Sequence, residues 1–434
     1  MSRDMGAASG TRATRRASYG QFDPGLDSYL LVDLCVRPGG IQTGPFGSQL
    51  HERDYVAAGT PIITVEHLGE NFISHDRVPR VCDGDRLRLS KYLLQTGDIV
   101  FSRVGSVDRR ALVRSAEDGW LFSGRCLRVR PNPELVDSLY LSYYFGLPSF
   151  KAYVRAVAVG ATMPSLNTEI LCNMSIRLPT LSEQRAIAEV LGALDDKIEA
   201  NIHMATIAEA LAQAYATKWL TGNDAPLTTL EDVADISKGA SYRSVDLASG
   251  DGWLVSLKCA GRDGAFQPEG LKPFSGAAKD SQVVGQGDIV VAQTDLTQRG
   301  SVIGRPYRVD PRGRAGRLVA SLDFAVVRPR DGLTREVLFA VLSQQEFRDH
   351  ALGFCNGTTV LHMNSRALPS YEFPLPKAEV IRTLTAAMGP ILKHADSVRR
   401  EGVAVSSLRD ALLPRLLSGE IRVPQAEPYI EAAL

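Results

Sequence analysis

The chain has 434 residues, of which 44% are hydrophobic and 23% are charged, and this composition favours a folded protein of two or more domains. The formal net charge is zero, which argues against a uniformly basic protein that wraps nucleic acid but leaves room for a local basic face. No run of about 18 apolar residues is present, and neither the six cysteines nor the seven histidines show metal-ligand spacing. Membrane proteins and metalloproteins are therefore disfavoured, and we expect free thiols in the cytoplasm.

The N-terminal residues 1–27 are rich in Arg, Ser, Ala and Gly, and they lack the apolar core of a secretory signal. This composition favours a disordered basic leader. A flexible basic arm that touches nucleic acid is the alternative.

The next segment, residues 28–180, contains short β-branched runs such as IITV and DIVF that Gly and Pro turns separate, and we predict a strand-rich globular domain. Residues 181–222 follow as a long helix. Its apolar stripe predicts one buried face that a partner helix would cover. The stripe consists of Ile187, Leu191, Leu194, Ile198, Ile202 and Leu211.

The second half of the chain repeats this plan in three segments: strand-rich residues 227–375, a long helix over 376–423 and a tail over 424–434. Gly389-Pro390 and Gly402 interrupt the second helical pattern. We therefore expect this helix to be less straight than the first.

Matched positions in the two halves keep an ordered spacing. The sequence GDIV begins at Gly97 and again at Gly287, 190 residues later. Other pairs lie 197 residues apart: Gly160 with Gly357, Thr162 with Thr359, Asn167 with Asn364, and Pro179 with Pro376. Upstream, the pairs 199 residues apart are Leu31 with Leu230 and Gly40 with Gly239. The series indicates an internal duplication. We predict an α/β (α+β) fold in which two similar globular domains, related by a pseudo-two-fold axis, are separated by two long antiparallel coiled-coil helices.

Several of these motifs together resemble the specificity subunits of type I restriction–modification systems. They are GGIQTGPFGSQL from Gly39, the GDIV strand, the G-x-T…N loops, the helix start at Pro179 that contains SEQRAIA, and LLSGEI ending at Ile421. The resemblance covers nearly all of residues 28–423. The second helix start, PKAEVIRTL from Pro376, lacks the SEQRAI wording.

The resemblance implies two target recognition domains, each of which reads one half of an asymmetric bipartite site in double-stranded DNA. The paired helices would fix the gap between the half-sites. The helices would also hold two methylase subunits, to which motor-nuclease subunits are added. The methylase would bind S-adenosylmethionine and the motor subunit ATP and Mg²⁺, so that this chain itself binds no cofactor.

DNA contact needs basic groups for phosphates and forked or amide side chains for base edges. Arg-rich stretches recur at 101–130 and 299–317, either as DNA contacts or as solvated faces. The predicted DNA-binding residues of the first domain are Gln42, Thr43, Ser48, Gln49, Arg103, Arg109, Arg110 and Thr162. Those of the second are Lys238, Ser241, Tyr242, Arg243, Gln293, Thr294, Arg299 and Thr359. For Thr162 and Thr359, stabilisation of a turn is an equal alternative.

The sequence lacks the motifs of several enzyme classes. The glycine-rich GGIQTGPFGS has no Gly-Lys-Ser/Thr ending of a P-loop, and neither an N-P-P-[YF] tetrapeptide nor a G-x-S-x-G pentapeptide occurs. We therefore expect a non-catalytic, DNA-binding protein. A stand-alone DNA methyltransferase or nuclease with a divergent site is one alternative, and a scaffold of the same fold that does not read DNA is the other.

Overall fold

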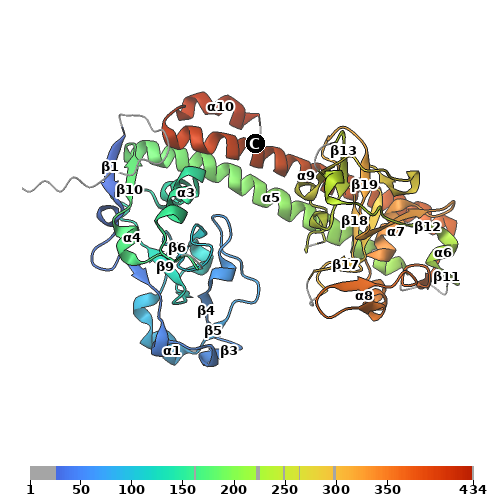
Figure 1. The fold of residues 1–434 in the computed structure, drawn as a ribbon, viewed down its shortest axis with the longest axis horizontal. Coiled ribbons are helices and arrows are strands. Elements are labelled where there is room, and N and C mark those ends of the chain that lie inside the picture. Colours follow the sequence, from blue (N-terminus) through green and yellow to red (C-terminus); the bar gives the residue numbers. More distant parts are fainter. Residues whose placement is uncertain are drawn as a thin grey trace, which may run out of the picture. The chain divides into compact units, whose positions relative to one another are not determined.

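The computed structural model describes residues 26–160, 163–220, 225–247, 250–262, 264–296 and 300–432 (Figure 1). The chain divides into two compact units. Unit 1 comprises residues up to Ile198 and from Ala404 onward, and unit 2 comprises Glu199–Val403. Each unit therefore contains one globular domain and a segment of both long helices. The described residues do not include residues 1–25 of the predicted leader. They also do not include Thr162 and Arg299.

The globular domain of unit 1 is built on an antiparallel four-stranded sheet. Its strand order is β2 (Ile41–Thr43), β9 (Cys126–Val129), β6 (Ile99–Ser102) and β7 (Arg110–Leu112). A second sheet has the order β3 (Tyr55–Val56), β5 (Arg80–Val81), β4 (Thr60–Ile63) and β8 (Leu121–Phe122). Strand β1 (Asp27–Leu30) pairs with β10 (Ser175–Leu178). The short helices are α1 (Asp83–Arg88), α2 (Ser138–Gly146), α3 (Pro148–Val157) and α4 (Thr168–Cys172).

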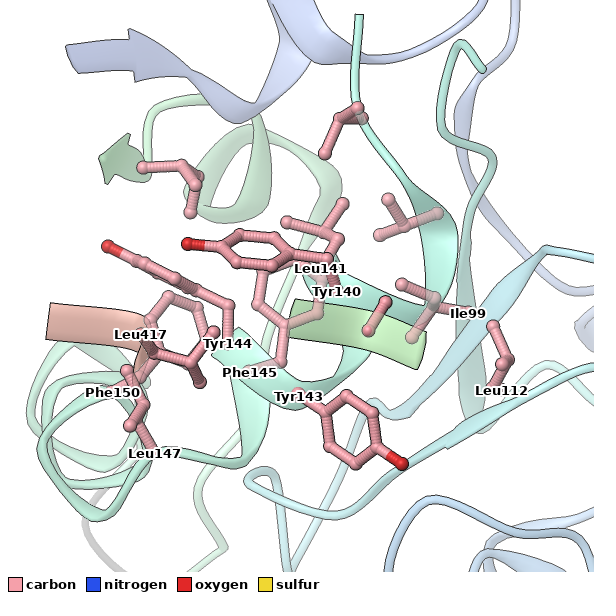
Figure 2. Packing of buried hydrophobic residues seen from close by; sticks show 14 of the residues in the cluster. Ile99, Leu112, Tyr140, Leu141, Tyr143, Tyr144, Phe145, Leu147, Phe150 and Leu417 are labelled. Carbon is pink, nitrogen blue, oxygen red and sulfur yellow. The ribbon is translucent and has the colours of Figure 1, made fainter. Parts of the chain in front are cut away.

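Aromatic residues of α2 and α3 fill the core between this sheet and the long helices (Figure 2). The helix α2 begins where the Asp137 carboxylate accepts a hydrogen bond from the Tyr140 N–H at 2.9 Å. The Phe145 ring lies 4.9 Å from both the Phe101 ring of β6 and the Phe150 ring of α3. The buried aromatic cluster thus ties the sheet to the helices behind it.

The globular domain of unit 2 repeats the first sheet with the same strand order: β12 (Ala234–Lys238), β20 (Phe324–Pro329), β16 (Ile289–Ala292) and β18 (Pro306–Arg308). Its second sheet is β14 (Lys272–Phe274), β13 (Gly252–Val255), β19 (Leu318–Ala320) and β15 (Val283–Val284). A third sheet has three strands in the order β17 (Thr294–Asp295), β22 (Leu361–Met363) and β21 (Cys355–Asn356). In a fourth sheet, β11 (Leu227–Thr229) pairs with β23 (Glu372–Pro374). The helices are α6 (Leu230–Val233), α7 (Arg335–Leu342) and α8 (Gln345–Gly353). The predicted α/β (α+β) class with two similar domains is confirmed.

An internal ion pair explains why GDIV and the later Arg-Pro recur in both halves. In unit 1 the guanidinium of Arg130 contacts both carboxylate oxygens of the buried Asp98 at 2.7 Å. In unit 2 Arg328 contacts Asp288 at 3.3 Å. Each aspartate also accepts a backbone N–H three residues before it, at 2.8 and 3.0 Å. The matched motifs therefore hold equivalent strands together.

The strand register corrects one predicted pair. Leu31 and Leu230 are equivalent, because their N–H groups donate to Met174 and Tyr371, which are themselves 197 residues apart. Gly239, however, follows β12 as Gly44 follows β2, and it is not the partner of Gly40. Equivalent residues are 199 apart before this point and 195 apart after it, so the first half carries four extra residues just before β2.

The two long helices are α5 (Leu181–Leu220) and α9 (Ala378–Ser418), and they run antiparallel within each unit. In unit 1 Arg422, just beyond the end of α9, pairs with Glu183 near the start of α5, and Arg409 pairs with Asp195 further along. In unit 2 the two helices contact each other through small apolar side chains, namely Ala205, Ala208, Ala395 and Val398. The predicted paired long helices are confirmed, and α9 continues without a break through the glycines and the proline.

The predicted stripe of α5 is wrong in its second half. Ile202 and Leu211 are 59% and 54% exposed. The buried seam passes instead through Asn201 and then the alanines at 205, 208, 212 and 216. Small side chains allow a close approach of the two helices, and the polar Asn201 hides the continuation of the apolar pattern.

The predicted C-terminal tail contains a helix that the sequence pattern did not indicate. The helix α10 (Val423–Glu431) has a proline in its first turn, and its Ala426 and Ile430 are buried in the core of unit 1. None of the described helices combines the length and the hydropathy needed to cross a bilayer.

Candidate nucleic-acid interface

Four segments of unit 1 meet at one end of the sheet β2-β9-β6-β7, and we call them sheet-end surface 1. They are Thr43–Phe46, Ser102–Gly105, Ser123–Arg125 and the hairpin residues Val159, Gly160 and Met163–Ser165. Backbone hydrogen bonds join them: Gly44 N–H to Cys126, Arg103 N–H to Arg125, and Leu166 N–H, directly after the hairpin, to Arg103, at 3.2, 2.8 and 2.8 Å. Segments far apart in the sequence thus form one continuous edge.

Unit 2 builds the same edge from the equivalent segments, which we call sheet-end surface 2. They are Lys238–Tyr242, Gln293–Asp295, Ser321–Asp323 and Asn356–Met363. The matching bonds are from Gly239 N–H to Phe324, from Gln293 N–H to Asp323 and from Met363 N–H to Gln293, at 3.0, 2.7 and 2.9 Å. The hairpins correspond as well, since His362 pairs with Thr294 and Asn356 as Ser165 pairs with Val104 and Val159.

The approach of the turns at these surfaces requires glycine. A Cβ added to Gly44 would lie 2.2 Å from the Ser123 carbonyl oxygen, and one added to Gly239 would lie 2.0 Å from the equivalent oxygen of Ser321. Both distances are shorter than any van der Waals contact. The two glycines therefore fix how the first segment of each surface lies against the third.

Two predicted residues of the first domain, Thr43 and Arg103, lie in sheet-end surface 1. The Arg103 guanidinium donates to the Gly124 carbonyl at 3.1 Å, and its carbon lies 5.8 Å from the centre of the Phe46 ring. Phe46 is 58% exposed, so the cation and the ring form one shared surface feature. Arg109 follows the loop of this surface, but its guanidinium donates to the Leu68 carbonyl.

Three other predicted side chains of the first domain serve internal contacts. The Gln42 amide oxygen accepts from Arg128 at 2.8 Å, and that of Gln49 accepts from the Tyr92 hydroxyl at 2.8 Å. Arg110 is only 2% exposed, so its predicted contact with DNA does not fit its position. The side chain of Ser48 lies outside the described part of the chain.

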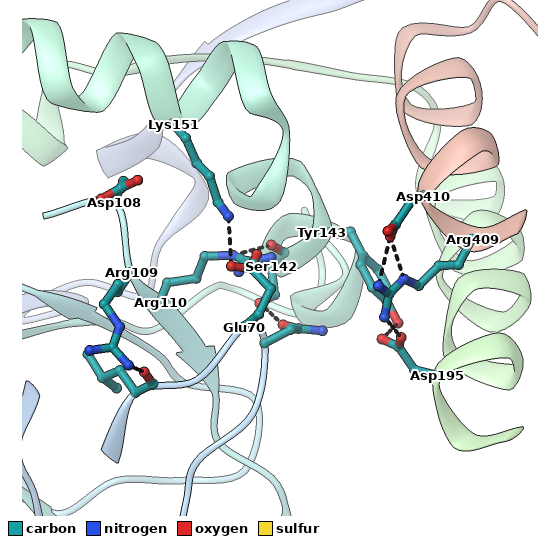
Figure 3. Close-up of polar contacts among 12 residues, drawn as sticks. Glu70, Asp108, Arg109, Arg110, Ser142, Tyr143, Lys151, Asp195, Arg409 and Asp410 are labelled. Carbon is teal, nitrogen blue, oxygen red and sulfur yellow. Dashed lines mark hydrogen bonds and ion pairs between the residues drawn. The ribbon is translucent and has the colours of Figure 1, made fainter. Parts of the chain in front are cut away.

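Figure 3 shows the polar cluster that Arg110 holds. Its guanidinium donates to the Ser142 carbonyl at 3.0 Å and to Glu70 at 2.5 Å, and Lys151 reaches the other Glu70 oxygen at 2.7 Å. Partial burial raises the pKa of Glu70, but the two cations outweigh it and leave the pKa lower than usual. Arg110 is therefore a structural residue that joins β7 to α2.

The Arg-rich stretches also serve the interior. In the first, Arg128 is buried and Arg130 pairs with Asp98. In the second, Arg308 pairs with Glu209 of α5 and Asp396 of α9. Further along, Arg312 pairs with Glu269, and the Arg314 guanidinium lies 4.7 Å from the centre of the Trp253 ring. The recurrence of arginine thus has a structural cause, because buried carbonyls and carboxylates need donors.

The predicted residues of the second domain gather more completely. Sheet-end surface 2 contains Lys238, Ser241, Tyr242, Gln293, Thr294 and Thr359, and Arg243 follows directly after it. Lys238, Ser241, Arg243 and Thr359 are exposed. Thr294 is 5% exposed within β17, so its side chain does not fit a DNA contact. Arg243 is 84% exposed and has Asp246 3.9 Å away.

The polar groups of the two surfaces differ in kind from the buried cysteines. Among the residues that the structure describes, no three His, Cys, Asp or Glu side chains are grouped to hold a metal ion. Burial raises the pKa of the thiols of Cys126 and Cys259 to about 12, which leaves them protonated and unreactive at neutral pH. The exposed groups at the two surfaces include cations, hydroxyls, the Asn356 amide, the His362 imidazole and apolar side chains, which suit binding.

The surfaces also contain residues that the sequence did not single out. Phe46 and Met163 are 58% and 59% exposed, and Arg125 is exposed at the first residue after the Ser123-Gly124 turn. Its equivalent, Asp323, was missed as well. The signal for both was their place directly after a turn that leads into a buried strand.

Residues 49–206 match the family model described as the type I restriction modification DNA specificity domain. The chain is 22% identical to the type I restriction enzyme HindI specificity subunit of Haemophilus influenzae, over 76% of this chain and 88% of that one. It is 21% identical to the MjaVIII specificity subunit of Methanocaldococcus jannaschii, over 70% and 75%. The crystal structure of a type I restriction-modification S subunit from M. genitalium aligns with a TM-score of 0.56 and 13% identity, over 91% of this chain and 97% of that one. Over most of its length the chain is therefore similar to specificity subunits of type I restriction–modification systems, and its residues 49–206 match the DNA specificity domain of that family.

Proposed function

We propose that this chain gives a type I restriction–modification complex its DNA sequence specificity, and that each unit reads one half of a bipartite target with its sheet-end surface. One observation carries the proposal: the same edge is built twice, from equivalent backbone contacts, but with different exposed side chains. Two such edges on one chain suit two different half-sites on a single duplex.

The proposed partners follow from this role. Double-stranded DNA is the ligand, and two methylase subunits and the motor-nuclease subunits supply the chemistry. S-adenosylmethionine would bind to the methylase, and ATP and Mg²⁺ to the motor subunit, while this chain is non-catalytic and acts in the cytoplasm. The binding character of the exposed groups at both surfaces supports this division of labour.

Two alternatives make different predictions. A stand-alone methyltransferase or nuclease would modify or cut DNA without any partner. A scaffold that has lost DNA reading would assemble with the methylase but bind all sequences alike. The exposed cations Arg125, Lys238 and Arg243 favour DNA contact over the scaffold.

The test uses the chain alone and together with its methylase partner. We expect no methyl transfer from labelled S-adenosylmethionine by the chain alone. With the methylase, we expect methylation confined to a bipartite motif, and affinity for that motif that falls steeply with salt. Methyl transfer by the lone chain would establish the enzyme alternative, and methylation or binding without sequence preference would establish the scaffold.

A further inference from the structure

One structurally equivalent position carries opposite charges in the two units. The carbonyl of Arg125 accepts from the Arg103 N–H at 2.8 Å, and the carbonyl of Asp323 accepts from the Gln293 N–H at 2.7 Å. Arg103 and Gln293 each follow the GDIV strand of their own half. The backbone at this position is therefore the same in both units, while the side chain is a cation in one and an anion in the other.

The surroundings of both side chains leave them available. Arg125 is exposed, and its guanidinium has no hydrogen bond or ion pair within the described part of unit 1. The carboxylate of Asp323 is partly exposed, and one oxygen accepts from the Ser321 hydroxyl at 3.1 Å. Burial raises the pKa of Tyr242, and the negative charge of Asp323 adds to this effect, which places the carboxylate beside a predicted DNA-binding residue.

The sign of the charge limits what each side chain can bind. A carboxylate is repelled by phosphates, so on a DNA-binding edge it is tolerated only where it meets a hydrogen-bond donor. In the major groove the amino groups of cytosine and adenine are such donors. An arginine can bind phosphates anywhere, but its fork also matches the O6 and N7 acceptors of guanine.

We propose that this position reads a base in both units, with Arg125 selecting guanine in one half-site and Asp323 selecting a base with an exocyclic amino group, cytosine or adenine, in the other. The inference rests on the proposed function. It adds that the charge difference between the halves makes the target asymmetric. It also separates base reading from the many arginines that hold the interior.

The experiment maps methylated bases in cells that express the methylase partner with each variant of the full chain. The variants are Arg125→Ala, Arg125→Lys and Asp323→Asn, with Arg53→Ala and Asp331→Asn as charge-matched controls at exposed sites away from the two surfaces. We expect Arg125→Ala and Arg125→Lys to lose preference for guanine at one position by about 5- to 150-fold, the range of one bidentate contact. We expect Asp323→Asn to relax one position in the other half-site. The controls should keep the wild-type motif.

The outcomes separate the inference from the function on which it rests. If the wild-type chain directed methylation to no bipartite motif, the proposed function would be wrong. If all three variants kept the wild-type methylation motif, only the inference about base reading would be wrong. If Arg125→Ala weakened binding to all DNA sequences equally while Arg125→Lys restored it, Arg125 would be a phosphate contact and the inference would be wrong for unit 1. Melting temperatures equal to wild type establish that the variants are folded.

Discussion

Single residues of this protein fall into two groups that the sequence alone does not separate. One Arg-rich stretch contains Arg103, Arg110 and Arg130. Arg103 lies in sheet-end surface 1, whereas Arg110 is buried and Arg130 pairs with an aspartate. Sequence spacing shows where arginines are, but the burial of each depends on strand register and on the turns between strands. This is why Arg110 and Thr294 were predicted as DNA contacts although both are buried.

The cluster around Glu70 predicts a pH dependence. The two cations lower its pKa in the folded protein, so its ionised form contributes stability above the unfolded pKa, and this contribution is lost as the pH falls through the folded pKa. Because Glu70 is 58% exposed and solvent screens its charge, we expect Glu70→Gln to lower the free energy of unfolding at pH 7 by about 1 kcal/mol, as the buried Arg110 loses its charged acceptor. Urea titrations at pH 7 and pH 3 measure this. An equal loss at both pH values would contradict the prediction.

The close approach at the second surface predicts the effect of one methyl group. Gly239→Ala would place a Cβ 2.0 Å from the Ser321 carbonyl oxygen, so we expect destabilisation of about 1–3 kcal/mol. Gly285→Ala is the matched control, because nothing lies within 4 Å of its added Cβ. Thermal melts of both variants decide the matter, and equal melting temperatures would show that the turn can move aside.

At the scale of elements, the pattern of the sequence predicted the long helices and the strands that follow GDIV. It placed the seam of α5 wrongly after Ile198, because Asn201 occupies the next seam position and alanines follow it. It also missed α10, whose short sequence contains two prolines and gives a weak periodic signal. Both errors arose where packing against a partner, and not local propensity, determines the structure.

The globular domain of unit 2 is attached to its helices by a polar contact. Arg308 of β18 donates to Asp396 of α9 at 2.8 Å and to Glu209 of α5 at 3.2 Å, and its side chain is 12% exposed. Desolvation raises the pKa of Asp396 even though Arg308 opposes it. Loss of the cation would leave the carboxylates of Asp396 and Glu209, which are 20% and 25% exposed, without their shared partner, while Arg399 would still pair with Glu209.

We therefore expect Arg308→Met to lower the free energy of unfolding of unit 2 by about 3 kcal/mol. Hydrogen exchange should rise in β18 and in the facing helix segments, while unit 1 stays unchanged. The control is Arg243→Met, which removes an exposed cation that has only a distant carboxylate neighbour. A variant Arg308→Met with wild-type exchange would show that the apolar packing alone holds this domain.

At the scale of the whole molecule, the duplication was the strongest inference from the sequence, and both units have the same first sheet. The ordered spacing of matched residues survives divergence because equivalent strands need equivalent turns. The composition of the two sheet-end surfaces could not be predicted in the same way, since each comes from four segments of its unit that only the fold brings together.

The proposed independence of the two readers predicts the result of a domain exchange. Replacing residues 28–180 by the corresponding domain of another family member should change one half-site and leave the other half-site and the gap intact. Methylated-base mapping of the chimaera measures both halves at once. A change in both half-sites would mean that the readers act together.

The paired helices predict a change in the gap. An insertion of seven residues near Ala205, matched by seven near Ala395, should lengthen the pair by about 10 Å at 1.5 Å per residue. Because each base pair rises about 3.4 Å, we expect the gap to widen by about three base pairs while both half-sites stay the same. Mapping the methylation motif of the doubly extended chain tests this prediction. An unchanged gap would show that the length of the paired helices does not set the spacing of the half-sites.

The duplicated Asp–Arg clamp has a consequence for how such a protein acquires new targets. Asp98 with Arg130 and Asp288 with Arg328 join neighbouring strands at one end of each first sheet, whereas Arg125 and Asp323 stand at turns at its other end. A substitution at the turn leaves the clamp and its strands in place. On the proposal that Arg125 and Asp323 read bases, new recognition can arise in one half by single exposed changes, without a loss of folding and without a change in what the other half recognises.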